Sequence, residues 1–273
     1  MVSKDQRRRQ LAREKFERQQ QRRSAARRKT KRRNVVIASA VAVALAAGGA
    51  VWASVGLAGG TSDRAAADEA PSRAPDPCDR PAKGTPSAKT WKKEPAMTVD
   101  TSAAYTAKLA TTCGAITLKL DAGKAPHTVN SFAFLAAQGY FDHSKCHRLD
   151  ESIHVLQCGD PKGTGQGTPG YTIPDENLKD SRLKGGVYPA GTVAMANRYD
   201  GKSKETRNTG GSQFFLVYQD SKLPPDYTPF GTITGGMDVL RKIADAGSRT
   251  DQSIGATVPN ATVVINRATV TKS

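Results

Sequence analysis

Hydrophobic and polar residues divide the chain into segments of different texture. Residues 1–34 contain almost no large apolar side chains, whereas residues 35–58 are apolar, small or hydroxylated and carry no charge. A helix of about 20 such residues crosses the hydrocarbon core of a bilayer. The pattern therefore predicts a transmembrane helix over residues 35–58. A cleaved signal peptide is the alternative, although this apolar run is longer than the roughly 7–15 residues usual in a signal peptide.

Residues 59–100 form a third segment with a different composition. They contain six prolines among alanine, serine, threonine and charged residues. A segment of this composition buries too little apolar surface to become ordered by itself. We therefore expect a linker over residues 59–100, which holds residues 101–273 away from the membrane.

Residues 101–273 show the short-range alternation of a β-rich domain. Residues 105–111 and 116–120 alternate on either side of Cys113 and Gly114, which predicts a β-hairpin. Pro126 suits the first position of a helix, because a proline there loses no needed N–H. Many short strands with two helices predict a barrel or sandwich with helical covers. The other strands are expected at 146–149, 153–157, 192–196, 213–217, 229–233 and 263–270, and a second helix at 237–244.

The formal net charge of +16 is concentrated in the tail. Residues 1–33 hold 15 of the 41 basic and 3 of the 25 acidic residues, so the remaining 26 basic and 22 acidic residues leave a net charge of only +4. Basic residues beside a membrane span stay on the cytoplasmic side. We therefore expect a single-pass protein of the cell membrane, with its N-terminus in the cytoplasm and its domain outside. The nearly balanced domain gives no reason to expect a nucleic acid as partner.

Five short blocks of the domain carry an ordered set of motifs. They read CHRL, VLQCGDP, MAN, TGGSQFF and LPPDYTPFG at residues 146–149, 155–161, 195–197, 209–215 and 223–231. With these motifs, the chain from about residue 105 to residue 270 resembles the cyclophilins, a family of peptidyl-prolyl cis-trans isomerases. The resemblance implies a mainly β fold, a closed eight-stranded antiparallel β-barrel with two covering helices. It also implies proline-containing polypeptides as partners, and isomerisation of X-Pro bonds in support of extracytoplasmic protein folding.

Isomerisation of an X-Pro bond requires no cofactor and no metal, because no covalent bond is broken. Rotation about the peptide C–N bond faces a barrier of about 18–20 kcal/mol. A catalyst has to bind the twisted amide more tightly than either planar form. Twisting localises a lone pair on the proline nitrogen, and a positioned N–H donor stabilises it.

The resemblance assigns roles to individual residues. Arg148 and Gln213 take the catalytic positions, and the guanidinium fork of Arg148 is expected to bind the proline's carbonyl and to present an N–H to the imide nitrogen. Phe214, beside Phe215 on a strand, should face the core. His154 stands where the family's pocket has an aromatic residue, and this polar replacement favours an alternative function, a proline-peptide binding or chaperone module with weak or no catalysis. The substrate-binding residues are His154, Val155, Gln157, Ala196, Asn197, Phe215, Leu223 and Tyr227.

All four cysteines, Cys78, Cys113, Cys146 and Cys158, follow the apolar segment. An even number on the oxidising side of a membrane predicts disulfides. Cys146 and Cys158 flank one strand–loop–strand unit, which leaves Cys78 for Cys113, although four cysteines allow three pairings. A metal site built on His143, Cys146, His147 and Cys158 is disfavoured, because residues 146 and 147 would point to opposite faces of a strand.

Overall fold

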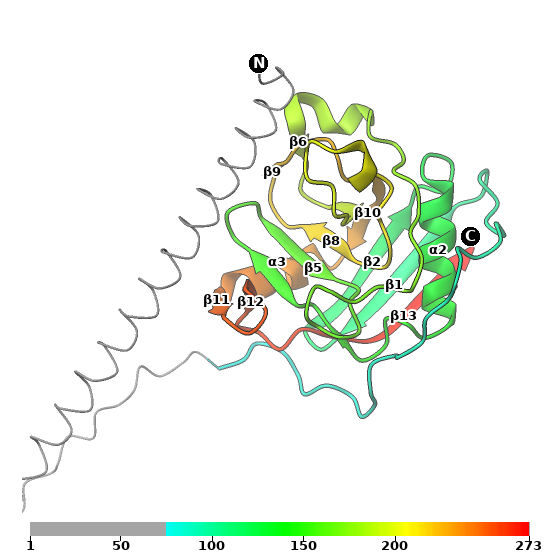
Figure 1. Ribbon diagram of the computed structural model, residues 1–273. Helices are drawn as coiled ribbons and strands as arrows, with labels where there is room; N and C mark the ends of the chain where they lie inside the picture. Colours follow the sequence, from blue (N-terminus) through cyan, green and yellow to red (C-terminus); the bar gives the residue numbers. More distant parts are fainter. Residues whose placement is uncertain (1–74, 273) are drawn as a thin grey trace, which may run out of the picture. The chain divides into compact units, whose positions relative to one another are not determined.

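The computed structural model describes residues 75–272 (Figure 1). The predicted tail (1–34), the predicted transmembrane helix (35–58) and residues 59–74 of the predicted linker lie outside the described residues. Within residues 75–272, no helix is long and apolar enough to cross a membrane.

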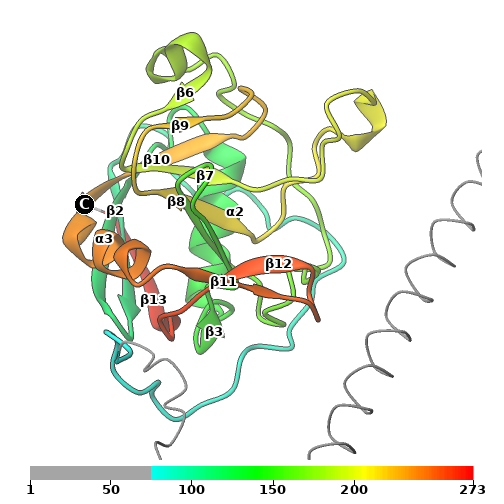
Figure 2. The same cartoon turned by 90° about the vertical axis from the view of Figure 1, so that its left-hand side faces the viewer.

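The main element of residues 75–272 is a curled sheet of nine antiparallel strands in the order β3-β13-β1-β2-β10-β7-β8-β5-β4. The predicted hairpin is present as β1 and β2, with Tyr105 opposite Leu120. Figures 1 and 2 show that the sheet bends into a half-barrel. Its strands are β1 (Tyr105–Thr111), β2 (Gly114–Leu120), β3 (Ser144–Lys145), β4 (Arg148–Asp150), β5 (Val155–Cys158), β7 (Thr192–Met195), β8 (Phe214–Val217), β10 (Pro229–Gly235) and β13 (Val264–Lys272).

The prediction of a closed eight-stranded barrel is wrong in its closure and its strand count. The edge strands of the sheet are β3 and β4. Among residues 75–272, β3 pairs with β13 and β4 pairs with β5, but these two edge strands do not pair with each other. The strand expected at 146–149 is split, and only Cys146 and His147 connect β3 to β4. The chain therefore passes from one edge of the curled sheet to the other within two residues, without a backbone ladder between the edges.

Two helices pack on the sheet. The first, α2 (Pro126–Ala137), begins at the proline that the sequence indicated and buries Val129, Phe132 and Leu135. The second, α3 (Met237–Asp245), buries Leu240 and Ile243. Figure 1 shows the two helices on different sides of the half-barrel. The smaller elements are the pair β6 (Val187–Tyr188) and β9 (Ser221–Lys222), the pair β11 (Ser248–Asp251) and β12 (Ala256–Pro259), and the 3-10 turns Ser181–Gly186 and Lys204–Thr206.

Strand alternation gives the sheet two apolar faces. Successive side chains of a strand point to opposite faces. Leu156 and Phe214 belong to the main core, whereas their neighbours Val155 and Phe215 belong to a second, smaller cluster. Phe214 contacts Phe132 of α2 edge-on, at 5.3 Å between ring centres, which confirms its predicted place in the core. The smaller cluster is the outer face of the strands β5, β7 and β8.

Residues 75–100, which we call the strap, lie against the domain. In Figure 1 the strap is the cyan segment that passes below the strands and rises beside α2. Cys78 forms a disulfide with Cys113, and Trp91 and Val99 pack against the main core. This packing differs from the free linker expected of residues 59–100, because a disulfide and a few long-range contacts supply the stabilisation that the composition lacks.

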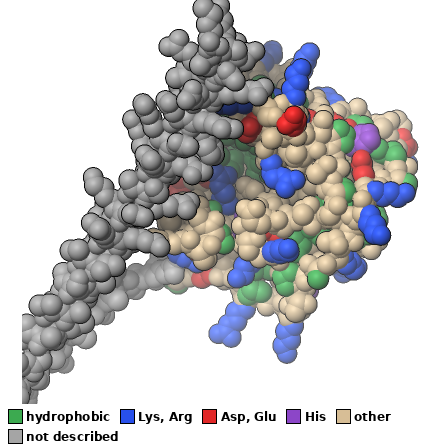
Figure 3. Space-filling view, viewed as in Figure 1, with side chains coloured by type: hydrophobic (Ala, Val, Ile, Leu, Met, Phe, Trp, Pro, Cys, Tyr) green, Lys and Arg blue, Asp and Glu red, His purple; other side chains and the backbone are tan. Residues whose placement is uncertain are grey.

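Charge is spread over the domain. Figure 3 shows one face, on which Lys and Arg side chains are separated by uncharged surface and do not form one continuous patch. This agrees with the net charge of only +4 beyond residue 33, from 26 basic and 22 acidic residues.

Candidate active site

The predicted catalytic residues meet on the outer face of the sheet. Arg148 of β4 lies opposite Gln157 of β5, and Gln157 lies opposite Phe215 of β8. Directly opposed residues of antiparallel strands project to the same side. The strand register therefore places an arginine, an amide and an aromatic ring in one row, with Gln213 just before β8.

A chain of side-chain amides orients Arg148. Gln213 donates from Nε2 to the carbonyl oxygens of Gly165 at 3.0 Å and Gly167 at 2.9 Å. Its Oε1 accepts from Gln157 Nε2 at 2.9 Å, and Gln157 Oε1 accepts from Arg148 Nη1 at 3.3 Å. Because carbonyl oxygens only accept, the first bond fixes the orientation of both amides. The chain thus presents an acceptor to Arg148 and holds its guanidinium in place.

Asp150 is a further partner of Arg148, and the motifs did not indicate it. Arg148 Nη2 donates to Asp150 Oδ2 at 2.5 Å. The other carboxylate oxygen accepts from the N–H and hydroxyl of Ser152. Burial opposes ionisation of Asp150, but the hydrogen bonds from Ser152 and the charge of Arg148 outweigh it and hold its pKa below the ordinary value. The available signal was its spacing, since residues two apart on a strand share a face.

An apolar cluster lies beside this polar row. Phe215 meets Tyr227 edge-on, with ring centres 5.4 Å apart. Tyr188 donates its hydroxyl to the carbonyl oxygen of Tyr227 at 2.8 Å, which fixes the loop that carries this ring. The cluster includes four of the predicted substrate-binding residues besides Phe215, namely Val155, Ala196, Leu223 and Tyr227.

His154, which was predicted in the pocket wall, has partners in a neighbouring loop and strand end. Its Nδ1 lies 3.0 Å from the carbonyl oxygen of Asp220, and its ring meets Tyr218 at 5.7 Å. The backbone of His154 is left-handed, with φ of 54°. Ile153 packs against the apolar cluster. Of the two neighbouring residues in the turn between β4 and β5, the apolar one therefore contacts the cluster, and the polar one binds the backbone of Asp220.

A polar hollow adjoins the cluster. It has a volume of about 130 Å³, and its lining includes Gln213, Asn197 and Arg198. The Asn197 side chain donates to the carbonyl oxygen of Asp226 at 2.8 Å. Arg207 also binds this loop through the Asp226 carboxylate and stacks over Tyr199 at 3.5 Å. The segment that follows Asn197 is thereby joined to the loop that carries Tyr227.

The remaining candidates for chemistry are the cysteines and His147. Disulfides join Cys146 to Cys158 and Cys78 to Cys113, which is the pairing that the sequence favoured. No cluster of three or more potential metal ligands occurs among residues 75–272. His147 is 5% exposed, and burial lowers its pKa. At neutral pH its imidazole is therefore uncharged.

The fold and the site define a class of protein. Residues 106–270 match the family model described as "Cyclophilin type peptidyl-prolyl cis-trans isomerase/CLD". This match covers more than half of the chain, which therefore belongs to the cyclophilin-type peptidyl-prolyl cis-trans isomerase family.

Individual relatives agree with this family. The chain is 48% identical over 181 residues to the probable peptidyl-prolyl cis-trans isomerase B of Mycobacterium leprae, an alignment that covers 62% of this chain and 59% of that protein. It is 50% identical over 149 residues to the protein of the same name in Mycobacterium tuberculosis, covering 51% and 46%. The chain thus spans about half the length of these curated relatives.

A solved structure shows the same fold. The crystal structure of a cyclophilin type peptidyl-prolyl cis-trans isomerase from Cryptosporidium parvum is similar, with a TM-score of 0.51 and 26% sequence identity. The similarity covers 62% of this chain and 99% of that chain. The mainly β half-barrel is therefore the cyclophilin fold.

Proposed function

We propose that this chain catalyses the cis-trans isomerisation of X-Pro peptide bonds in polypeptides. The observation that carries this proposal is the chain of side-chain hydrogen bonds that joins Arg148, Gln157 and Gln213. This chain lies beside the apolar cluster around Phe215. An isomerase needs a surface for the proline ring and a positioned donor for the twisted amide. These two parts lie next to each other on one face of the sheet.

The proposed reaction rests on differential binding. The proline ring packs on Phe215 and its neighbours, while the substrate extends along the hollow lined by Asn197 and Gln213. Arg148 donates to the carbonyl of the proline and directs an N–H toward the imide nitrogen, whose lone pair becomes localised as the amide twists. Interactions that are stronger with the twisted amide than with either planar form lower the barrier of about 18–20 kcal/mol.

Preorganisation favours Arg148 for this role. Arginine stays protonated at every pH at which proteins fold, so its donors are always available. Gln157 and Asp150 hold the guanidinium from two sides, and its side chain remains 32% exposed. A donor that is already in position needs no reorganisation when the amide twists.

The alternative function, binding or chaperone activity with weak or no catalysis, loses the feature that favoured it. That feature was the polar His154 in the pocket wall. Because Ile153 packs against the apolar cluster and His154 turns to Asp220, the cluster keeps its apolar character.

The activity can be tested with a proline-containing peptide. The full chain, purified in detergent, is added to an Ala-Pro test peptide, and the approach to cis-trans equilibrium is followed with a protease that cleaves only the trans form. The proposal predicts an exchange rate well above the uncatalysed one, which corresponds to tens to hundreds of seconds. A rate equal to that of the detergent buffer would contradict it.

We further propose that a single span over residues 35–58 anchors the protein in the cell membrane, with the domain outside the cytoplasm. The uncharged apolar run and the 15 basic residues before residue 34 support this orientation. Two disulfides in the described domain also support it, because disulfides persist in oxidising compartments. The proposal predicts that the full chain resists alkaline extraction from membranes and that protease added to intact spheroplasts degrades the domain. Extraction with the soluble fraction, or protection from protease, would contradict the anchor or the orientation respectively.

A further inference from the structure

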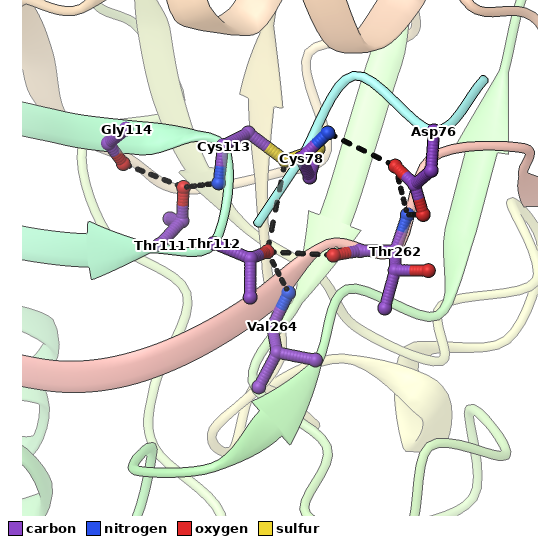
Figure 4. Close-up of a disulfide and its surroundings, with 8 residues drawn as sticks. All are labelled: Asp76, Cys78, Thr111, Thr112, Cys113, Gly114, Thr262 and Val264. Atoms are coloured by element: carbon purple, nitrogen blue, oxygen red, sulfur yellow. Dashed lines mark hydrogen bonds between the residues drawn. A yellow bond between two sulfur atoms is a disulfide. The ribbon is translucent and has the colours of Figure 1, made fainter. Parts of the chain in front are cut away.

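The strap lies outside the matched family region, since it ends at residue 100 and the match begins at residue 106. One of its attachments, near its beginning, is covalent. Figure 4 shows Cys78 joined to Cys113 in the turn between β1 and β2, beside Thr112 and Val264. Asp79 N–H also donates to the carbonyl oxygen of Thr112 at 2.8 Å. This attachment fixes the beginning of the strap to the β1–β2 turn and β13.

A further attachment, near the end of the strap, is the side chain of Asn130 on α2. Its Oδ1 accepts from Thr98 N–H at 2.9 Å and Val99 N–H at 3.3 Å, and its Nδ2 donates to the carbonyl oxygen of Ala96 at 3.1 Å. Asn130 is 1% exposed, so the strap satisfies a polar side chain that is buried beneath it. Both ends of the strap are therefore held by specific bonds.

Trp91, between these attachments, contacts a loop of the site. Its ring packs edge-on against Phe134 of α2, with ring centres 5.1 Å apart, and lies 5.8 Å from Tyr140. Its backbone N–H donates to the carbonyl oxygen of Pro169 at 2.8 Å. The backbone of the strap and the backbone of this loop approach so closely at Gly170 that a Cβ there would lie 2.5 Å from the carbonyl oxygen of Trp91. Gly170 also has a φ of 92°, so a glycine is required for this contact.

The loop that Trp91 contacts, residues 160–170, also carries the acceptors that orient Gln213. These are the carbonyl oxygens of Gly165 and Gly167. From the inside, the buried carboxylate of Asp160 accepts the N–H groups of Thr164 and Gly167, each at 3.0 Å. Asp160 thus holds the loop from the core side, and Trp91 holds it from the opposite, strap side.

We propose that the strap is a positioning element of the isomerase site, which acts through Trp91 on the loop 160–170 and so on Gln213, Gln157 and Arg148. This inference rests on the proposed isomerase function. Trp91 does not touch the reacting amide; it restricts the positions that the Gly165 and Gly167 carbonyls can take. Because the amide chain is continuous from these carbonyls to Arg148, loosening the loop loosens the guanidinium.

The substitution Trp91→Ala in the full chain tests this role, with Asn130→Ala as the matched control. Trp91→Ala removes the ring that anchors, on Phe134 and Tyr140, the same stretch of backbone whose N–H donates to Pro169. Asn130→Ala removes bonds to Ala96, Thr98 and Val99 and leaves this anchor in place. A misplacement of about 1 Å in a positioning group can cost on the order of 100-fold in rate. We expect Trp91→Ala to lower kcat/KM about tenfold or more through kcat, Asn130→Ala to leave it within about twofold, and Trp91→Phe to restore most of it.

A second readout is independent of catalysis. Hydrogen exchange of the Gln213 side-chain amide, followed by NMR, reports directly on its bonds to Gly165 and Gly167. We expect faster exchange in Trp91→Ala and unchanged exchange in Asn130→Ala, both measured well below their melting temperatures. Unchanged Gln213 exchange in Trp91→Ala, or an equal loss of kcat/KM in both variants, would overturn the positioning role. A wild-type chain without isomerase activity would instead overturn the proposed function, and the exchange data would still decide whether the strap positions Gln213.

Discussion

Phe214 and Phe215 are adjacent on β8, yet they belong to two different regions of the molecule. Phe214 is 0% exposed and packs with Phe132 in the core, whereas Phe215 is 4% exposed and packs with Tyr227 on the outer face. Their burial is nearly equal, so burial does not tell core from site. The neighbours do, because only the outer face also carries the polar row that ends in Arg148.

The largest expected effect separates these two phenylalanines. Removing a buried aromatic ring from a core costs about 3–5 kcal/mol of stability, so Phe214→Ala should lower the free energy of unfolding by this amount. Phe215→Ala should cost less stability and raise KM, because its ring contacts substrate in the proposed complex. Chemical denaturation and steady-state kinetics measure the two effects. If Phe214→Ala does not fold, the milder Phe214→Leu serves in the same comparison; equal effects of both positions on KM would contradict the division into core and site.

Arg148→Ala tests the polar row. Losing one preorganised donor to a transition state typically costs about 100- to 1000-fold in kcat, and we expect a loss of this size with little change in the melting temperature. The matched control is Arg241→Ala on α3, at an exposed position away from the polar row, which should keep full activity. A loss of less than about threefold in Arg148→Ala would remove this residue from the mechanism.

A smaller effect is expected in the turn between β4 and β5. Ile153→Ala removes methyl and methylene groups, each worth about 0.8 kcal/mol when buried, and should raise KM several-fold. His154→Asn should leave KM within about twofold, because asparagine accepts the left-handed backbone that His154 has. Peptide kinetics on both variants check this expectation. A larger increase of KM in His154→Asn than in Ile153→Ala would show that His154, rather than Ile153, contacts the substrate.

The smallest expected effect is that of pH. The pKa of Asp150 is lowered, so its ion pair with Arg148 is complete above the ordinary carboxylate value of about pH 4 and is lost only as the pH falls through the lowered pKa. Burial lowers the pKa of His147, which therefore stays neutral at neutral pH. We expect kcat/KM to be nearly constant from about pH 6 to pH 9. A bell-shaped profile in this range would indicate a titrating group that the polar row does not contain.

Local patterns predicted the parts of the fold that depend on near neighbours. Pro126 begins α2, and the alternation of apolar residues predicted the hairpin of β1 and β2. Phe214 faces the core, as expected from the assignment of the adjacent Phe215 to the site. The motif order also placed Arg148, Gln157 and Gln213 together, because their strands pair directly or through β8. These features follow from periodicity and from matching motifs.

The features that the sequence did not reveal depend on contacts or on the detail of one turn. Counting back from Gln157 gave no sign that Ile153 packs against the apolar cluster, or that His154 has a left-handed φ and binds the backbone of Asp220. Trp91 stands in a proline-rich segment whose composition resembles that of a linker, and contacts such as that of its ring with Phe134 show that the segment is packed. Among the described residues, the sheet is open because β3 pairs with β13 and β4 with β5, but β3 and β4 do not pair with each other, which motif order does not encode.

The most direct test of the account is NMR exchange spectroscopy of an Ala-Pro peptide at equilibrium, with catalytic amounts of the full chain. The method reports cis-trans exchange and binding in one sample, so it separates turnover from binding alone. If the chain is an isomerase, exchange cross-peaks between the cis and trans signals should appear in the presence of the wild-type chain and should be lost in Arg148→Ala. Line broadening without exchange cross-peaks would show a protein that binds proline peptides and does not isomerise them, which would contradict the account.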